Sequence, residues 1–418
     1  MKRVVLLLIC FSLLLSFASC TIRPIGERGG SSSEETKETT PPLPETVPPA
    51  TEPPETSAPV TTEPLPPPPP ETKSVTLVAA GDNIIYKGNW IDAARGQPKG
   101  EYDFTKMYAR IAPVIAGADI AVINQETLMC GDGFDLDSYP QFNSPQKAGL
   151  DLLSVGFDVI GMANNHMADK GAKGLAGTIA FWKSVTGNGT LMVGGYENAT
   201  DYASIRTLER GGITFAFLAY TFGTNLSLHA DEPVLPVFDR TVCKSQIAAA
   251  RQAADVVVVL AHWGSENKMQ PNNYEIEWAQ CLADAGADII IGAHPHVIQP
   301  VVYLTAADGR EVLCAYSLGN LLAEQAHAYN CLGGLLSLTV TVTGDEVRTE
   351  NVTFLPTVCH FGNTWHNEIY FLSDYTDALA EEHAVSTYYE NSAVTVKKLT
   401  TYVRETIDAS FLPDYLRK

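Results

Sequence analysis

The feature that most constrains this fold is an apolar segment that ends in side chains able to bind a metal. In its clearest copy, the apolar run 287–291 is followed by Gly292 and then by His294, Pro295 and His296. Such a run is typical of a buried parallel strand, and α/β proteins bind ligands at the carboxyl ends of these strands. Because Pro295 restricts the backbone between the histidines, both imidazoles can be held toward one point. The pattern predicts a metal site, although two satisfied loop histidines would have the same local sequence.

Four more apolar segments end in side chains of the same kinds. The segments are 75–80, 118–123, 157–162 and 254–260, and the side chains that follow them are Asp82, Asn124, Glu126, Asn165, His166 and His262. A structural histidine does not need such neighbours, so the recurrence favours a metal site over isolated loop histidines.

Segments with a helical spacing of apolar residues lie between these strands, at 146–153, 246–254 and 274–286. Alternation of strands and helices predicts a doubly wound α/β layer whose strand-terminal loops form the site. Further strands, the last two of them an antiparallel pair around a glycine turn, are predicted at 213–218, 312–316, 335–342 and 347–354.

These motifs together resemble the CapA family, the poly-γ-glutamate capsule biosynthesis proteins, which are a branch of the calcineurin-like metallophosphoesterase fold. The blocks that carry the resemblance occur in order between Ser74 and His360, and they are Gly81-Asp82, Asn124-Gln125-Glu126, Ala163-Asn164-Asn165-His166, His262-Trp263-Gly264, Gly292-Ala293-His294-Pro295-His296 and Tyr316-Ser317-Leu318-Gly319-Asn320. The resemblance implies a layered α/β sandwich and work on capsule or cell-wall polymer at the bacterial surface.

The metallophosphoesterase pattern implies two divalent metal ions, with Mn, Fe or Zn as the candidates. The residues matched to its ligands are Asp82, Glu126, Asn165, His262, His294 and His296. The resemblance implies that His262 and His294 complete the site of Asn165, while His296 serves the other site. Glu126 occupies the region of the bridging carboxylate, with Asn124 as the alternative. Two metals that share a water lower its pKa and stabilise the transferring phosphoryl group.

The same pattern assigns residues that act beside the metals. His166 matches a histidine that contacts the leaving group, and Asp169 is its candidate partner for fixing the tautomer. The candidate substrate contacts are Asn124, Glu266 and Asn320. Trp263 is expected either to pack beneath the metal loop or to form a wall of the cleft.

One position departs from the superfamily pattern. Ile84 stands where a histidine usually follows the first aspartate by two residues. The first metal site therefore lacks the imidazole ligand usual at this position, and one metal remains the alternative to two. Five further histidines lie outside the strand-end pattern and are expected in loops or on the surface; they are His229, His327, His360, His366 and His383.

The N-terminus predicts where the protein works. A charged start and a short apolar core over 1–20 have the layout of a secretory signal, and Phe17-Ala18-Ser19-Cys20 resembles a bacterial lipobox. We expect lipidation of Cys20 and an anchor at the extracellular face of the cytoplasmic membrane; ordinary secretion after cleavage near Ala18 is the alternative. The Pro-, Thr- and Glu-rich segment 21–73 cannot bury enough apolar surface to fold and is predicted to be a disordered tether.

The remaining chain is predicted to comprise a CapA-like domain, 74–360, and a mainly helical extension, 361–418. A formal net charge of −20 excludes nucleic acid as a partner. The expected partners are a cell-envelope polymer or its precursor, the membrane through the N-terminal lipid, and capsule-synthesis membrane proteins. Three functions fit: a metal-dependent hydrolase, a non-catalytic component that binds, exports or anchors polymer, and a scaffold with a structural metal.

Overall fold

The computed structural model describes residues 70–228, 233–362, 364, 366–388 and 392–417. The predicted signal segment with Cys20, residues 21–69 of the predicted tether, and His229 lie outside the described residues. Within this part of the chain, no helix is long and apolar enough to cross a membrane. Its six cysteines, Cys130, Cys243, Cys281, Cys314, Cys331 and Cys359, are buried and unpaired.

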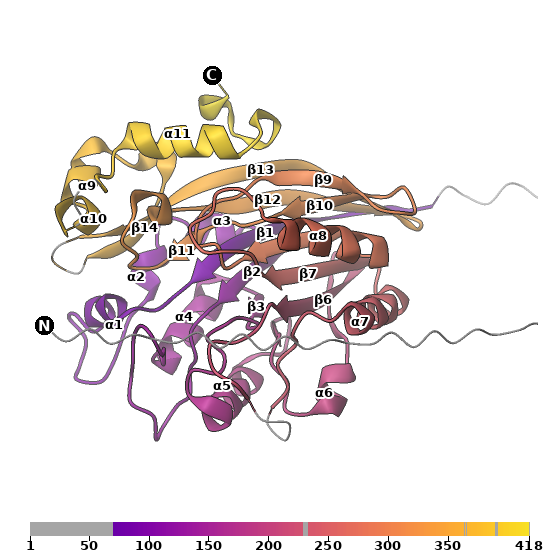
Figure 1. Ribbon diagram of the computed structural model, residues 1–418, viewed down its shortest axis with the longest axis horizontal. Helices are drawn as coiled ribbons and strands as arrows, with labels where there is room; N and C mark the ends of the chain where they lie inside the picture. Colours follow the sequence, from indigo (N-terminus) through magenta and orange to yellow (C-terminus); the bar gives the residue numbers. More distant parts are fainter. Residues whose placement is uncertain (1–69, 229–232, 363, 365, 389–391, 418) are drawn as a thin grey trace, which may run out of the picture. The chain divides into compact units, whose positions relative to one another are not determined.

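The strands form two sheets (Figure 1). The first sheet has the order β14-β13-β12-β1-β2-β3-β4, with β11 paired to β1. Its strands are β1 (Thr72–Asn83), β2 (Ile120–Gln125), β3 (Val159–Gly161), β4 (Leu191–Val193), β11 (Asn320–Leu322), β12 (Leu332–Thr343), β13 (Glu346–Phe361) and β14 (Asn367–Phe371). The second sheet has the order β5-β6-β7-β8-β10-β9. Its strands are β5 (Arg206–Arg210), β6 (Ile213–Thr221), β7 (Val256–His262), β8 (Ile289–Ala293), β9 (Val301–Thr305) and β10 (Glu311–Ala315).

Helices cover the outer face of each sheet. The first sheet packs against α1 (Lys87–Ala93), α2 (Thr105–Tyr108), α3 (Ala112–Ala116), α4 (Gln146–Val155) and α5 (Gly171–Val185). The second sheet packs against α7 (Arg240–Ala253) and α8 (Asn273–Ala285), while α6 (Ala199–Ala203) precedes β5. Leu77 and Val122 of the first sheet share a core between the sheets with Phe217 and Val258 of the second. The predicted layered α/β sandwich is confirmed.

The predicted single doubly wound layer is wrong in one respect, because the strands divide between two sheets. β1 to β4 run parallel, as the alternation of strands and helices predicted. The chain then leaves this sheet and forms the antiparallel hairpin β5–β6, in which Gly211 and Gly212 both have positive φ. Glycine adopts a positive φ readily, and the tightest hairpin turns require a positive φ at two successive residues. This turn joins the first two strands of the second sheet.

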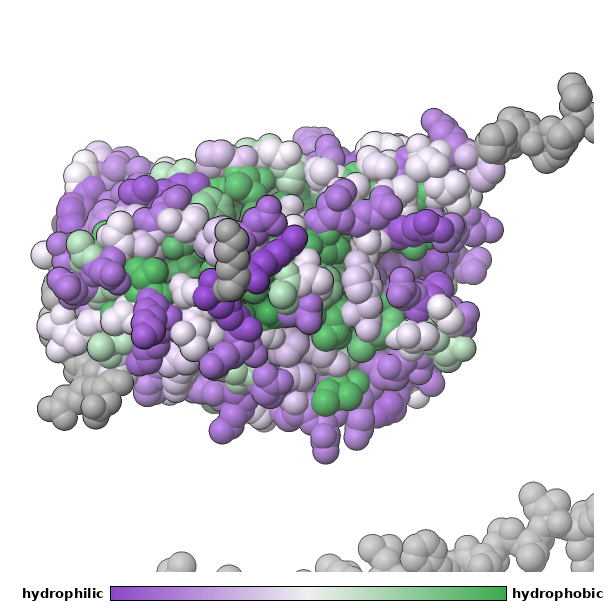
Figure 2. Space-filling model, turned by 90° about the horizontal axis from the view of Figure 1, so that it is seen from above, coloured by the Kyte–Doolittle hydropathy of each residue, from purple (hydrophilic) through white to green (hydrophobic). Residues whose placement is uncertain are grey.

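The segment after residue 360 belongs to the same folded unit as the strands. β14 extends the first sheet, and the rest contains α9 (Asp377–Glu382), α10 (Ala384–Tyr388), α11 (Val396–Thr406) and the 3-10 helices η2 (Leu372–Asp374), η3 (Ala409–Phe411) and η4 (Asp414–Leu416). A further 3-10 helix, η1 (Ala328–Cys331), lies earlier in the chain, directly before β12. Leu399 and Val403 of α11 join the core between the sheets, and Figure 1 places α11 beside β13. Figure 2, viewed from this side, shows a largely hydrophilic surface with smaller hydrophobic patches.

Two of the histidines expected in loops or on the surface are buried. The prediction is wrong for His360, which lies in β13, whereas His383 lies in the connection between α9 and α10 but is buried. His327 and His366 are exposed, whereas His360 and His383 are at most 2% exposed. The cause for His360 is that β13 continues to Phe361, well beyond the predicted strand end at 354. His383 packs beside His360 with its ring 5.2 Å away; its Nε2 donates to the Cys359 carbonyl, and its Nδ1 accepts from Val385 N.

This buried pair predicts a loss of stability in mild acid. Burial lowers the pKa of His383 to about 4 and that of His360 to about 3, below the value of about 6.5 in an unfolded chain. Between pH 6.5 and 4 the unfolded state therefore binds protons that the folded state does not. The free energy of unfolding should fall as pH falls, by up to about 1.4 kcal/mol per pH unit for each histidine. Chemical denaturation of metal-free His383→Gln should show a shallower pH dependence than the wild type; equal slopes would contradict this assignment.

Candidate metal centre

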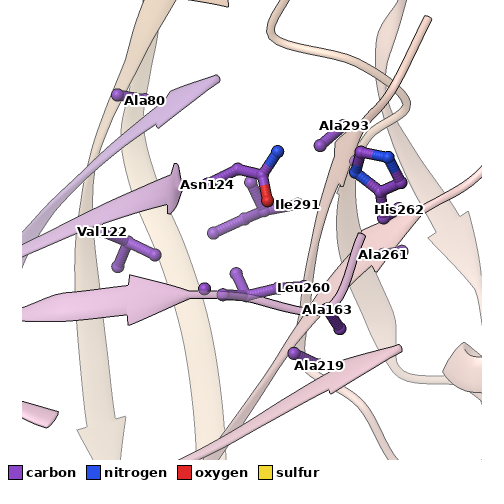
Figure 3. Close-up of a pocket in the computed structure, with 12 residues that line it drawn as sticks. Ala80, Val122, Asn124, Ala163, Ala219, Leu260, Ala261, His262, Ile291 and Ala293 are labelled. Carbon is purple, nitrogen blue, oxygen red and sulfur yellow. The ribbon is translucent and has the colours of Figure 1, made fainter. Parts of the chain in front are cut away.

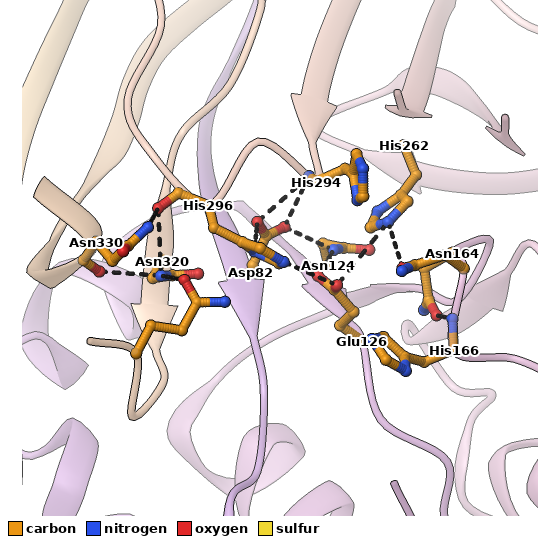
Figure 4. A network of polar contacts seen from close by, with 12 residues as sticks. Asp82, Asn124, Glu126, Asn164, His166, His262, His294, His296, Asn320 and Asn330 are labelled. Atoms are coloured by element: carbon orange, nitrogen blue, oxygen red, sulfur yellow. Dashed lines mark hydrogen bonds and ion pairs between the residues drawn. The ribbon is translucent and has the colours of Figure 1, made fainter. Parts of the chain in front are cut away.

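The predicted ligands converge where the carboxyl ends of parallel strands from the two sheets meet. Asp82 lies at the end of β1, level with Asn124 at the end of β2, and Glu126 follows directly. From the second sheet, His262 ends β7, and His294 and His296 follow β8. Figure 4 shows these side chains pointing toward one another from both sheets.

The side chains form two groups that share one carboxylate. Asp82, Glu126 and His296 can offer ligand atoms within 4.8 Å of one another, and so can Glu126, His262 and His294. The Oε1 atom of Glu126 is 3.5 Å from Nε2 of His296 and 3.9 Å from Nε2 of His262. This position between two imidazoles suits the bridging role predicted for Glu126. A third combination within the same distance contains Glu266, His294 and His296.

The remaining predicted ligand, Asn165, lies beside the second group. Its Oδ1 is 3.0 Å from Nε2 of His262. On the side of the first group, Nδ1 of His296 is 3.1 Å from Oδ2 of Asp82. The division expected from the metallophosphoesterase pattern, with Asn165 on one side and His296 on the other, is therefore present in the geometry.

Several polar atoms in the centre are buried without a hydrogen-bond partner. They are Oε1 of Glu126, Nδ1 of His262 and Nδ1 of His294. Leaving such atoms unpaired is costly in a folded protein. Carboxylate, imidazole and amide donors together suit Mn, Fe or Zn, so the residues present fit one or two divalent ions.

Burial sets the protonation states that a metal needs. Burial and the neighbouring imidazoles lower the pKa of His294 to about 3 and that of His262 well below its usual value, which keeps both neutral and able to ligate. Burial alone would also lower the pKa of His296, but Glu126 and Asp82 raise it to about 9. Burial, together with Asp82 and Glu266, holds the pKa of Glu126 well above its usual range. A divalent cation would relieve this concentration of buried negative charge.

The position of Ile84 belongs to the apolar core. Ile84 is buried with Phe142 and Ala323, so no imidazole enters from β1. Between the sheets below the centre lies a cavity of about 10 Å³, close to the smallest that holds one water. Figure 3 shows that small apolar residues line it, with Asn124 and His262 the polar side chains among those labelled. This dry floor strengthens electrostatic interactions in the centre.

Two of the predicted substrate contacts support the ligands instead. Nδ2 of Asn124 donates to Oδ1 of Asp82 at 2.8 Å and to Oε2 of Glu126 at 3.3 Å. Asn320 is fully buried and donates to the carbonyl of His296. This placement favours a role in holding the ligand loops over direct contact with a substrate. Glu266, the third candidate, is exposed at the rim.

The predicted His166–Asp169 pair is present next to the metal centre. Nδ1 of His166 is 2.7 Å from Oδ2 of Asp169, which also accepts from the backbone of Phe142. An ionised carboxylate can only accept, so Nδ1 carries the proton and Nε2 is left free to exchange one with a bound group. The edge-on ring of Phe142 lies 4.8 Å away and limits rotation of His166.

His166 and Glu266 line a pocket of about 290 Å³ beside the centre. The other lining residues are Tyr139, Pro140, Gln141, Asn165, Asp169, Asn225 and Leu226. None of these described lining residues is a lysine or arginine. The pocket therefore offers amide, aromatic, carboxylate and imidazole groups but no lysine or arginine side chain to an incoming molecule.

Sequence reasoning missed the loop after β6. Phe222 lies over the centre, with its ring 4.6 Å from that of His294 and 6.3 Å from that of His262. Asn225 accepts a hydrogen bond from Nδ2 of Asn165 at 3.3 Å. An apolar strand, β6, precedes this loop and ends in Thr221, which is not a typical metal ligand; the loop therefore lacked the signal that marked the others. Trp263 packs beneath the loops as expected, buried and donating to the carbonyl of Tyr316.

A sandwich with shared carboxylate and imidazole groups at one sheet edge defines a candidate metal-binding α/β protein. Residues 76–325, more than half of the chain, match the family model described as "Bacterial capsule synthesis protein PGA_cap". The chain belongs to this family, and the predicted resemblance is confirmed.

Relatives in the genus Bacillus agree with this assignment. The chain is 35% identical over 178 residues to the PGA biosynthesis protein CapA of Bacillus subtilis (strain 168), covering 42% of this chain and 44% of that protein. It is 36% identical over 266 residues to the capsule biosynthesis protein CapA of Bacillus anthracis, covering 61% of each. The match thus spans less than two thirds of either relative. Among solved structures, the calcineurin-like phosphoesterase YfkN from Bacillus subtilis is similar with a TM-score of 0.37 and 13% identity, over 83% of this chain and 100% of that one.

Proposed function

We propose that this protein is a cell-surface, metal-dependent hydrolase of phosphoester type that acts in the synthesis of capsule poly-γ-glutamate or another cell-wall polymer. The observation that carries the proposal is the position of Glu126. Its buried, unpartnered Oε1 lies between imidazoles of two ligand groups, as a carboxylate shared by two ions requires. The family membership and the names of the Bacillus relatives supply the link to capsule polymer.

The side chains around the centre have separable roles in this reaction. Asp82, Glu126 and His296 would hold one ion, and Glu126, Asn165, His262 and His294 the other. Bound there, the ions would supply an activated water and neutralise charge on phosphoryl oxygens. Asn124 orients the carboxylates of Asp82 and Glu126. His166, held by Asp169, gives a proton from Nε2 to the departing oxygen.

The pocket suggests what lies next to the reacting group. Because no lysine or arginine lines it, the metal ions would have to supply most of the attraction for an anionic substrate. Amide groups and the exposed ring of Tyr139 suit a neutral part of a polymer or of its precursor.

A non-catalytic polymer-binding, export or anchoring role is the second candidate. The observation that favours it is Ile84, since the apolar core occupies the position of an expected ligand and weakens the case for full hydrolytic activity. The His166–Asp169 pair favours hydrolysis, because neither a binding cleft nor a structural metal needs it.

Metal dependence separates these candidates. The full-length protein, as purified, should contain one to two Mn, Fe or Zn ions by elemental analysis and should hydrolyse bis(4-nitrophenyl) phosphate. Chelation should abolish turnover, and added Mn²⁺ should restore it. Metal content without turnover would overturn the hydrolase proposal in favour of polymer binding. Absence of metal would overturn both the metal-dependent hydrolase and the scaffold with a structural metal.

We also propose that Cys20 is lipidated and anchors the protein at the extracellular face of the cytoplasmic membrane, near capsule-synthesis membrane proteins. The support is the lipobox-like sequence before Cys20 and the polar segment that follows. Cys20→Ala should move the protein from the membrane fraction to the medium or leave it unprocessed, because acyl chains supply the durable attachment. Unchanged fractionation of this variant would favour simple secretion or retention by the cell wall.

A further inference from the structure

The loop that carries His294 and His296 has an unusual backbone. Their φ angles are 97° and 55°, in the left-handed region that residues other than glycine rarely adopt. Pro295 separates them, so two costly conformations lie on either side of a rigid residue. Such a loop keeps its shape only where its surroundings hold it.

Asn267, Asn320 and Asn330, from distant segments, hold this loop, and Figure 4 shows Asn320 and Asn330 beside His296. The backbone N–H of Asn267 donates to the Pro295 carbonyl at 2.8 Å. Nδ2 of Asn330 donates to the His296 carbonyl at 3.0 Å and to Oδ1 of Asn267 at 2.8 Å. Nδ2 of Asn320 donates to the same His296 carbonyl at 3.3 Å and to the carbonyl of Asn330 at 2.9 Å.

Asn330 is the centre of this arrangement. Both hydrogens of its amide nitrogen are used, its backbone carbonyl is the acceptor for Asn320, and its side chain is buried. Its side chain bonds to the His296 carbonyl and to Asn267 rather than to any ligand side chain, so its influence reaches the centre through the His296 carbonyl. An amide nitrogen with both hydrogens engaged has a single defined orientation.

We propose that Asn330 is a positioning residue that holds His296 in its metal-binding orientation; this inference rests on the metal centre proposed above. Asn330 lies on η1, and η1 packs against α11, where the rings of Tyr329 and Tyr402 lie 6.4 Å apart. The C-terminal segment therefore supports the element that carries Asn330. This gives the segment after residue 360 a part in organising the metal centre.

The proposal predicts a loss confined to one metal. In full-length Asn330→Ala, the affinity for the ion held by Asp82, Glu126 and His296 should fall by about 10- to 100-fold, as is typical when a group behind a ligand is removed. The ion held by Asn165, His262 and His294 with Glu126 should bind nearly as in the wild type. Isothermal titration calorimetry of the metal-free protein with Mn²⁺ measures both affinities without relying on turnover.

Two further variants make the test sharp. Asn330→Asp keeps the shape but removes both donated hydrogens, so it should show the same loss even if the alanine variant folds poorly. Asn351→Ala is the control, because Asn351 is likewise an asparagine but lies exposed in β13, away from the centre. It should leave both affinities unchanged.

A double-mutant comparison decides whether Asn330 acts through His296. Adding Asn330→Ala to His296→Ala should cause little further loss of metal, whereas adding it to His262→Ala should cause its full loss. Equal effects in both backgrounds, or an equal weakening of both ions, would overturn the proposal. If the wild type binds two metal ions but hydrolyses nothing, the proposed hydrolase is wrong, and the metal-affinity comparison still tests the role of Asn330. If the wild type binds no metal, both the proposed hydrolase and the positioning role of Asn330 are overturned.

Discussion

Replacing Glu126 by glutamine should empty both metal positions at once. Glu126 is the residue common to the two ligand groups, and its Oε1 lies within 4 Å of imidazoles on both sides. Glutamine keeps the shape but removes the negative charge, so each ion loses a ligand and the charge that attracts it. Losing several kcal/mol of transition-state stabilisation in this way corresponds to a fall in turnover of about 10³-fold or more. Elemental analysis and phosphodiester hydrolysis measure the two effects.

The same substitution should not unfold the metal-free protein. Burial raises the pKa of Glu126 well above its usual range, so the ionised carboxylate destabilises the folded state when no metal cation is present. The melting temperature of metal-free Glu126→Gln should equal or exceed that of the metal-free wild type. Glu311→Gln, at the exposed start of β10, is the control and should change neither metal content nor turnover. Retention of both ions by Glu126→Gln would show that the carboxylate is not shared.

The chemistry at the strand ends could be predicted from sequence because geometry leaves little freedom there. In a parallel sheet, residues that end neighbouring strands lie side by side, as the pairing of Asp82 with Asn124 and of His262 with Ala293 shows. An apolar run followed by a polar side chain therefore marks both the strand and the edge at which the side chain appears.

The partition into two sheets could not be predicted from the same signals. Apolar runs of similar length form β3 in the first sheet and β7 in the second, because a buried strand looks alike in either one. The chain moves from the first sheet to the second between β4 and β5, before the hairpin turn at Gly211 and Gly212. A glycine pair of this kind indicates a turn but not the sheet to which the hairpin belongs.

Residues that act through tertiary contacts carried no local signal. Asn330 acts on the centre from η1 and Phe222 from the loop after β6, and neither belongs to a strand-end motif typical of metal sites. His360 looked like a loop residue because its strand continues past the point where the apolar alternation fades. In each case a distant segment determines the environment, which a local pattern cannot report.

Replacing His166 by alanine should separate catalysis from metal binding. In the proposed reaction His166 donates a proton from Nε2 while Asp169 holds Nδ1 at 2.7 Å. General acid assistance is typically worth ~10²- to 10⁴-fold in rate, so turnover of the phosphodiester should fall by that factor. Metal content should stay near that of the wild type, because the two candidate ligand groups that share Glu126 do not include His166.

Two further variants identify the reason for that loss. Asp169→Asn keeps the shape of the partner but can no longer accept the Nδ1 proton with a charged oxygen, so turnover should fall less than in His166→Ala while metal content is again retained. The exposed His327, changed to alanine, is the control and should have no effect on turnover. Normal hydrolysis and normal surface polymer in cells that carry His166→Ala, with metal bound, would exclude proton donation by His166. The cleft would then serve to bind polymer, and the metal ions would attract an anionic chain, because no lysine or arginine lines the adjoining pocket.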